Sequence, residues 1–153
     1  MKTIASFTIN HVILKKGMYV SRIDGDVVTY DIRMKIPNMG DYVSNGALHT
    51  FEHLFATYAR NSKFADQVIY VGPMGCRTGF YFLLRDSVSK ADAIALVKES
   101  FEFIRGFEGD IPGATHKECG NYREHDLPGA KEVAADMLEV LKDWKPEDMR
   151  YPE

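Results

Sequence analysis

Two histidines and a glutamate occur within five residues of this sequence, in the motif His-Thr-Phe-Glu-His at residues 49–53. If residues 49–61 are helical, His49 and His53 lie one turn apart on the same face. At about 100° per residue, Glu52 lies roughly 60° to one side of His49. The spacing predicts two imidazoles that can bind a metal ion, and beside them a carboxylate that can move protons at a metal-bound substrate.

Arg60 falls about 20° from His49 around the same helix, further along its axis. A cation there can hold the anionic end of a substrate whose reactive end meets the metal. Ser44 or Asn45 is a suitable N-cap for this helix. The helix itself is predicted from apolar residues that recur every three or four positions: Leu48, Phe51, Phe55 and Tyr58.

The chain has two cysteines, Cys76 and Cys119, which are too far apart for a zinc knuckle or a redox Cys-x-x-Cys motif. Three protein ligands with an open fourth position are typical of a catalytic metal site, and Cys119 would complete such a set with the two imidazoles. His116 and His125 are alternatives to Cys119 that the spacing leaves open. Imidazole and thiolate ligands suit zinc or ferrous iron better than magnesium or calcium.

Cys76 follows a Gly-Pro-Met-Gly turn at residues 72–75, between short apolar runs at residues 68–71 and 78–84. Two strands flanking this turn would place the thiol at the end of a sheet. The glycines either let the backbone approach a bound ligand or merely make the turn. With the metal polarising a substrate carbonyl, Cys76 and Glu52 are the candidate proton shuttles.

The remaining elements can be predicted from periodicity and turn residues. Residues 18–23 and 27–36 form a predicted hairpin around an Asp-Gly-Asp turn. Helices are predicted over residues 89–105 and about 128–144, and residues 6–11 alternate as in an extended segment. This order predicts an α+β fold, with a mainly antiparallel sheet of about four strands and helices packed on one face. The other sheet face, if apolar, calls for a partner, and apolar residues near the N-terminus favour a dimer.

Composition places the chain among ordinary globular proteins. Its 153 residues are 45% apolar and 27% charged, which predicts one globular domain over residues 1–153. A net charge of −3 without a run of basic residues argues against nucleic acid or a membrane surface as a partner. Because there is no signal-peptide pattern and no apolar run of membrane-spanning length, we expect a cytoplasmic protein.

Five motifs occur in order along the chain: Ser-Phe-x-x-x-His at residues 6–11, Asp-Ile-Arg-x-x-x-Pro-Asn at 31–38, His-Thr-x-Glu-His at 49–53, Gly-Pro-Met-Gly-Cys-x-Thr-Gly-Phe-Tyr at 72–81 and Glu-Cys-Gly at 118–120. Together, over nearly the whole chain, they resemble the S-ribosylhomocysteine lyase family, the LuxS family. Asn10 and Tyr70 depart from the aspartates that many members carry at these positions.

The resemblance implies a homodimer with two active sites at the subunit interface. Each site would hold one divalent metal ion, Fe²⁺ as the native ion and Zn²⁺ or Co²⁺ as substitutes. The implied reaction cleaves the thioether of S-ribosylhomocysteine to homocysteine and 4,5-dihydroxy-2,3-pentanedione, by carbonyl migration and β-elimination. The reaction would serve the recycling of activated methyl groups and the synthesis of the quorum-sensing signal autoinducer-2.

The resemblance also implies roles for individual residues, by position in the motifs. The metal ligands would be His49, His53 and Cys119. The general acid/base residues would be Cys76 and Glu52. The substrate-contacting residues would be Ser6, His11, Arg33 and Arg60.

Two other interpretations compete with the lyase. The motif at residues 49–53 also fits the inverted zinc-peptidase pattern, with Glu52 activating a water molecule. Such peptidases need a large cleft and usually a glutamate as third ligand, whereas this short chain offers Cys119. A metal-stabilised binding module without catalysis is the third interpretation, and it would leave Cys76 without a role.

Overall fold

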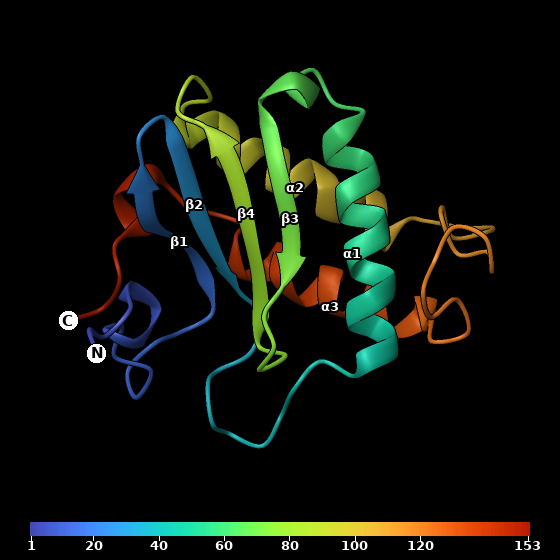
Figure 1. Cartoon of the computed structure of the whole chain (residues 1–153), viewed down its shortest axis with the longest axis horizontal. Coiled ribbons are helices and arrows are strands. Elements are labelled where there is room, and N and C mark those ends of the chain that lie inside the picture. Colours follow the sequence, from blue (N-terminus) through green and yellow to red (C-terminus); the bar gives the residue numbers. More distant parts are fainter.

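The computed structural model describes residues 1–153 as an antiparallel sheet with helices on one face (Figure 1). This confirms the predicted α+β fold. The strands are β1 (Gly17–Asp24), β2 (Val27–Arg33), β3 (Val68–Pro73) and β4 (Gly79–Arg85), in the order β1-β2-β4-β3. The α-helices are α1 (Asn45–Arg60), α2 (Lys90–Arg105) and α3 (Leu127–Val140). Short 3-10 helices are η1 (Ala5–Phe7), η2 (Ala65–Gln67) and η3 (Pro146–Met149).

The two central strands divide their side chains between two different environments, because successive residues of a strand point to opposite faces. One face packs against the helices in a single apolar core. The opposite face carries polar and aromatic side chains, among them Asp31, Arg33 and Tyr81. The core-facing residues of β2 and β4 are Val28, Tyr30, Ile32, Phe80, Phe82 and Leu84.

Helix α1 begins where the sequence predicts. The Ser44 side chain accepts a hydrogen bond from the Ala47 amide at 3.2 Å, which makes Ser44 the N-cap. Phe51 and Phe55 are fully buried, so the predicted apolar face of α1 does meet the core. Burying two such side chains contributes several kcal/mol and fixes the rotation of α1, and with it the direction of the polar side chains on its other face.

The N-terminal segment was predicted to be extended, and this is wrong. Residues 5–7 form η1, and residues 8–13 are turns and bends held by local hydrogen bonds. The alternation of polar and apolar residues does not produce a strand here because no neighbouring strand pairs with it.

Two element ends also differ from prediction. Strand β2 ends at Arg33, because the next two amides, of Met34 and Lys35, both donate to the carbonyl of Thr78. The last helix ends at Val140, so Trp144 lies beyond it, where the indole Nε1 donates to Met18 O at 2.9 Å. This tryptophan anchors the C-terminal segment to β1.

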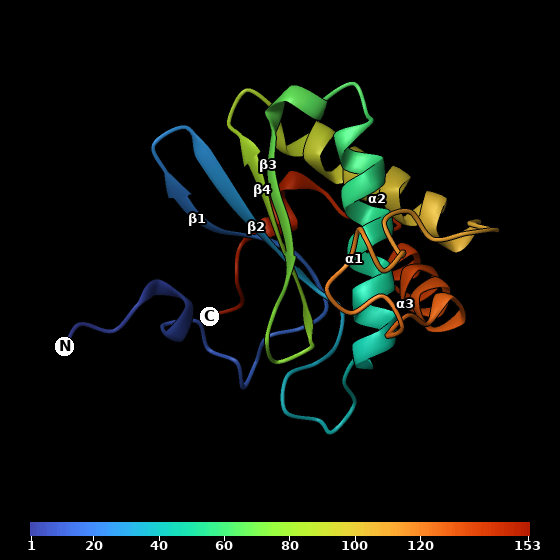
Figure 2. The ribbon, with the colours of Figure 1, turned by 45° about the vertical axis from the view of Figure 1, so that its right-hand side comes forward.

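The helix-free face of the sheet, called the open sheet face below, is only partly covered in the single chain. Figure 2 shows the three α-helices on one side of the sheet and the N-terminal arm, together with the C-terminus, on the other. Two apolar residues of this arm are largely exposed, Phe7 at 75% and Val12 at 90%. Tyr70 of β3 and Ile23 of β1 are exposed as well.

None of the helices combines the length and the apolar character needed to cross a lipid bilayer.

Candidate functional site

A compact group of ligand atoms lies between α1 and the connector over residues 106–126. The sulfur of Cys119 is 3.3 Å from His49 Nε2 and 4.0 Å from His53 Nε2. With one nitrogen of His125, the four ligand atoms all lie within 4.8 Å of one another. The predicted His-His-Cys set is therefore brought together, across about seventy residues of sequence for Cys119 and His49.

The donor atoms fit a divalent metal ion of intermediate softness. His53 Nδ1 lies 2.8 Å from Pro112 O, and a carbonyl oxygen can only accept, so Nδ1 carries the hydrogen. The Nε2 lone pair of His53 is thus free on the side that faces the Cys119 sulfur. Two imidazole nitrogens and one sulfur can hold zinc or ferrous iron and leave a coordination position for substrate.

The connector is shaped to present Cys119. Its amide donates to Thr115 O at 3.0 Å, and the Thr115 hydroxyl donates to Glu118 Oε2 at 2.7 Å, so a hydrogen-bonded turn precedes the thiol. Gly113 has a φ of 71°, and a Cβ there would lie 3.3 Å from His53 Nδ1. A glycine at this position therefore allows the Pro112 carbonyl to reach His53.

Of the two alternative histidines, His125 belongs to the group and His116 does not. The His125 ring stacks on His49, with centroids 4.2 Å apart, and its Nδ1 is 2.9 Å from Thr50 Oγ1. Its Nε2 is buried without a hydrogen-bond partner. Burial, followed by the charges of His49 and His53, lowers the pKa of His125 and so favours the neutral imidazole.

Thr50 belongs to the His-Thr-x-Glu-His motif but has no role predicted from the sequence, and in the structure it joins α1 to α3. Its buried Oγ1 accepts a hydrogen bond from the Asp126 amide at 2.9 Å. Asp126 in turn caps α3, because its Oδ1 accepts from the Gly129 amide at 2.9 Å. The threonine inside the motif thereby holds His125 against His49.

Glu52 and Arg60 lie in a cavity of about 350 Å³ next to His53. Arg60 Nη2 donates to Ile69 O at 2.9 Å, which ties the guanidinium to strand β3. The exposed side chain of Tyr70 also lines this cavity. A half-buried carboxylate and a cation thus border the metal-ligating group on the side that the helix geometry predicts.

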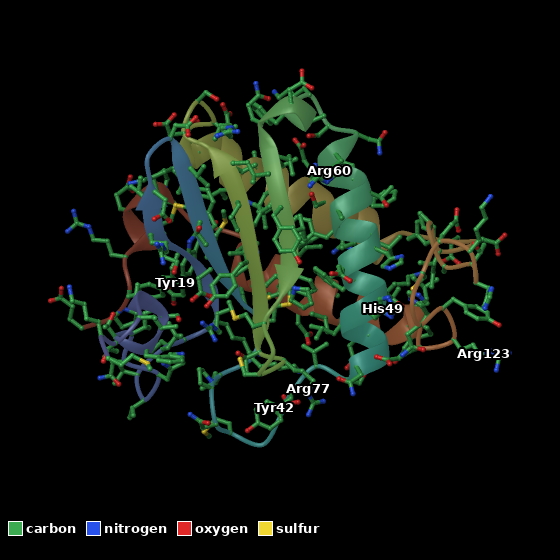
Figure 3. The ribbon with its side chains drawn as sticks, in the orientation of Figure 1. Tyr19, Tyr42, His49, Arg60, Arg77 and Arg123 are labelled. Carbon is green, nitrogen blue, oxygen red and sulfur yellow. The ribbon has the colours of Figure 1, made fainter.

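Cys76 is exposed in the turn between β3 and β4, as predicted. Figure 3 shows its neighbour Arg77 at the end of this hairpin, and His49 on α1. The left-handed residue of the turn is Arg77, with a φ of 61°, and neither glycine adopts such a conformation. Arg77 Nη1 donates to Val43 O at 3.2 Å, which fastens the turn to the segment before α1.

The sulfur of Cys76 lies 3.1 Å from Thr78 Oγ1, and Arg33 Nη1 donates to the same oxygen at 2.8 Å. Arg33 is only 1% exposed, and its other donors hold Asp31 in a two-point contact of 3.1 and 2.7 Å. Burial opposes the charge of Arg33, but the hydrogen bond and charge of Asp31, together with Cys76, raise the pKa of Arg33 above its ordinary value. Within a single chain, the Arg33 guanidinium therefore contacts the buried side chains of Asp31 and Thr78.

Ser6 and His11 lie on the N-terminal arm, away from α1. Ser6 lines a cavity of about 440 Å³ on the open sheet face, beside Tyr70 and Tyr81. His11 Nδ1 is 2.9 Å from Ile9 O. The predicted site residues therefore fall into two sets, one on α1 and the connector and the other on the open sheet face and the arm.

Comparison with known proteins agrees with these motifs. The family model described as S-Ribosylhomocysteinase (LuxS) matches residues 4–148. An S-ribosylhomocysteine lyase of Phocaeicola vulgatus is 50% identical, over 99% of this chain and 98% of its own length. S-ribosylhomocysteine lyases of Clostridium beijerinckii and Borreliella afzelii are 48% and 46% identical, each over 99% of this chain and over 99% and 100% of their own lengths. The chain therefore belongs to the LuxS (S-ribosylhomocysteinase) family.

Proposed function

We propose that residues 1–153 form a single catalytic domain, a metal-dependent lyase that cleaves S-ribosylhomocysteine to homocysteine and 4,5-dihydroxy-2,3-pentanedione. The observation that carries the proposal is the convergence of His49, His53 and Cys119 beside Glu52, in a chain whose relatives are named for this reaction. In a cytoplasmic setting the reaction would recycle homocysteine and release the precursor of a quorum-sensing signal.

The proposed ligands of one divalent ion per subunit are His49, His53 and Cys119, with Fe²⁺ as the native ion and Zn²⁺ or Co²⁺ as substitutes. A metal bound there supplies Lewis acidity toward a substrate carbonyl or hydroxyl oxygen. The hydrogen bond from His53 Nδ1 to Pro112 O supports this assignment, because it orients the imidazole as the second shell of a metal site does.

Proton transfer is the task of the protein's own side chains. The carbon–sulfur bond of the starting aldose is not activated for cleavage. It becomes so only when the carbonyl has moved to C3, because the hydrogen on C4 is then acidic and C4 is bonded to the carbon that carries the sulfur. We assign the carbon protons of these enolisations to Cys76, which takes each proton from one carbon and returns it to the neighbouring one. Glu52 would serve the hydroxyl protons and the elimination step, in which homocysteine leaves with the bonding electron pair as its thiolate.

Substrate contacts are proposed on both sets of residues. Arg60 would pair with the carboxylate of the homocysteine part, since its guanidinium lies in the same cavity as Glu52. Ser6 and His11 would contact the ribosyl part from the arm. Arg33 would support the substrate site from the sheet interior, through its hydrogen bond to Thr78 next to Cys76.

The active unit would be a homodimer in which one subunit provides the ligand set and its partner provides Cys76. The open sheet face and the exposed apolar arm support this proposal, because such surfaces call for a covering partner.

Mixing Cys76→Ala with His49→Ala subunits should restore activity to about a quarter of the wild-type value, since half the dimers are mixed and each has one intact site. Failure of the mixture to exceed either variant would place each site within one subunit.

A thiol-release assay tests the lyase itself. Metal-replete protein is mixed anaerobically with S-ribosylhomocysteine and a thiol-reactive chromophore, beside Cys76→Ala and a chelator-treated sample. Thiol released by the wild type and lost in both other samples is the expected result, with Tyr58→Phe as a matched variant that keeps activity. Casein cleavage without thiol release would instead favour the peptidase, whose third ligand is usually a glutamate.

A further inference from the structure

The last residues of the chain pack on the helix-free side of the sheet, next to β1. The Tyr151 ring stacks on Tyr19, with centroids 5.1 Å apart and planes at 24°. Met149 is buried, and Trp144 donates to the β1 backbone. The C-terminal segment is thus fixed in place over β1.

The Tyr151 hydroxyl reaches a buried ion pair. It donates to Asp31 Oδ2 at 2.7 Å, the same oxygen that accepts from Arg33 Nη2. Asp31 is fully buried and Arg33 nearly so, which means that water cannot replace a missing partner. Burial and then the charge of Asp31 raise the pKa of Tyr151, so the hydroxyl remains a donor at neutral pH.

The same ion pair reaches the sulfur of Cys76. Arg33 Nη1 donates to Thr78 Oγ1, and this oxygen lies 3.1 Å from Cys76 Sγ. Because Thr78 accepts from Arg33 with one lone pair, its own O–H can donate to a thiolate, and its second lone pair can accept from a thiol. The contact therefore serves both protonation states that a proton shuttle must visit.

We propose that Tyr151 is a positioning residue for Cys76, acting through a chain of hydrogen bonds that runs Tyr151–Asp31–Arg33–Thr78–Cys76. The inference rests on the proposed function, in which Cys76 moves protons, and it adds the C-terminal segment to the machinery of that site. Without the phenol, Asp31 Oδ2 loses one of two donors, the carboxylate can rotate, and the fork of Arg33 loses the orientation that holds the Thr78 hydroxyl at the sulfur.

The charged and titratable groups around the sulfur come from three elements. Arg33 and Asp31 lie on β2, Tyr81 on β4 and Tyr151 on the C-terminal segment. Arg33 is the only cation among them, and its orientation depends on Asp31. A change in the reactivity of Cys76 on removing the distant Tyr151 hydroxyl would therefore travel through Asp31 and Arg33.

The test measures thiol reactivity, which does not require lyase activity. Tyr151→Phe keeps the ring that stacks on Tyr19 and removes only the hydroxyl. The rate of alkylation of Cys76 by iodoacetamide is followed by peptide-resolved mass spectrometry from about pH 6 to about pH 9. We expect a rate at neutral pH about two- to tenfold lower than in the wild type, the range set by one hydrogen bond, with the alkylation rate of Cys119 unchanged in the same samples.

A matched control variant and a double-mutant cycle can each refute the proposal. Tyr58→Phe also removes a phenol, on α1 against Phe103, and should alkylate as the wild type does. Adding Tyr151→Phe to Asp31→Asn should change the Cys76 rate far less than adding it to the wild type. An unchanged Cys76 rate in folded Tyr151→Phe, or equal losses at both cysteines, would overturn the proposal. Altered Cys76 reactivity in a protein that releases no homocysteine would leave this coupling standing and reject the lyase.

Discussion

Removing the carboxylate of Asp31 should destabilise the fold strongly, because it leaves Arg33 as an unpaired cation in the interior. Asp31 is 0% exposed and Arg33 1% exposed, and the carboxylate accepts three hydrogen bonds, two from Arg33 and one from Tyr151. Breaking a buried pair by removing one partner costs about 3–5 kcal/mol. In a chain of this size each kcal/mol lowers Tm by about 2–4 °C, so Asp31→Ala should melt roughly 6–20 °C below the wild type.

The chain offers a matched control for this experiment. Asp24 makes the same two-point contact with Arg22, at 2.7 Å for each bond, but both side chains are 53% exposed. Exposed pairs are screened by water and salt and contribute little to stability. Asp24→Ala should therefore melt close to the wild type, although it removes the same chemical groups.

Calorimetry and urea unfolding followed by circular dichroism measure both variants under the same conditions. The double variant Asp31→Leu with Arg33→Met should recover much of the loss, because a buried pair replaced by apolar side chains leaves no unpaired charge. Equal melting temperatures for Asp31→Ala and Asp24→Ala would refute this reasoning, as would a double variant less stable than Asp31→Ala.

Two further predictions concern metal affinity at the connector and the pH dependence of stability at Tyr151. Gly113→Ala should weaken Zn²⁺ binding about tenfold or more in competition with a chromophoric chelator, because the added Cβ crowds His53 Nδ1 and displaces the Pro112 carbonyl that orients the imidazole. Gly109→Ala, at a φ of 101° with open space around it, should bear a similar backbone strain without this loss of affinity. Equal Zn²⁺ affinities of the two variants would contradict the role of the carbonyl. Burial raises the pKa of Tyr151, so the folded protein binds more protons than the unfolded chain above about pH 10, and this stabilisation is present below that pH and is lost as the pH rises further. The urea midpoint should fall less steeply between about pH 9 and about pH 11 in Tyr151→Phe than in the wild type, and parallel curves would contradict the shift.

The parts of the site that could be predicted from sequence are those that depend on local geometry. The direction of His49, His53 and Glu52 follows from helix periodicity once the apolar face of α1 is known. The structure places the two histidines in one ligand group and Glu52 in the cavity beside His53. The exposed position of Cys76 follows from the turn between two strands. The fold class follows in the same way, because the alternation within strands and the caps of helices are local properties.

Other features depend on contacts between distant segments and could not be predicted in this way. Spacing left Cys119 and His125 as alternatives, and the structure places both in one group. His125 lies there because its ring is bonded to Thr50, which also accepts from the Asp126 amide. The burial of Arg33 was not predicted either, since its hydrogen-bond partners include Thr78, 45 residues further along the chain.

The N-terminal arm illustrates a different limit. Its polar and apolar alternation resembles that of a strand, but a strand needs a neighbour, and the single chain provides none for residues 6–11. In the same way, the left-handed conformation of Arg77 has no sequence marker, because it is imposed by hydrogen bonds to the segment around Val43.

The most direct test of the central claim is the identity and ratio of the products formed from S-ribosylhomocysteine. Metal-replete protein is incubated with the substrate, homocysteine is quantified as its thiol adduct, and the dione is trapped with an aromatic diamine and quantified by mass spectrometry. Carbonyl migration followed by β-elimination predicts equal amounts of homocysteine and 4,5-dihydroxy-2,3-pentanedione, with neither formed by Cys76→Ala. Homocysteine accompanied by ribose would indicate hydrolysis and contradict the elimination, and the absence of both products from the metal-replete protein would reject the lyase assignment.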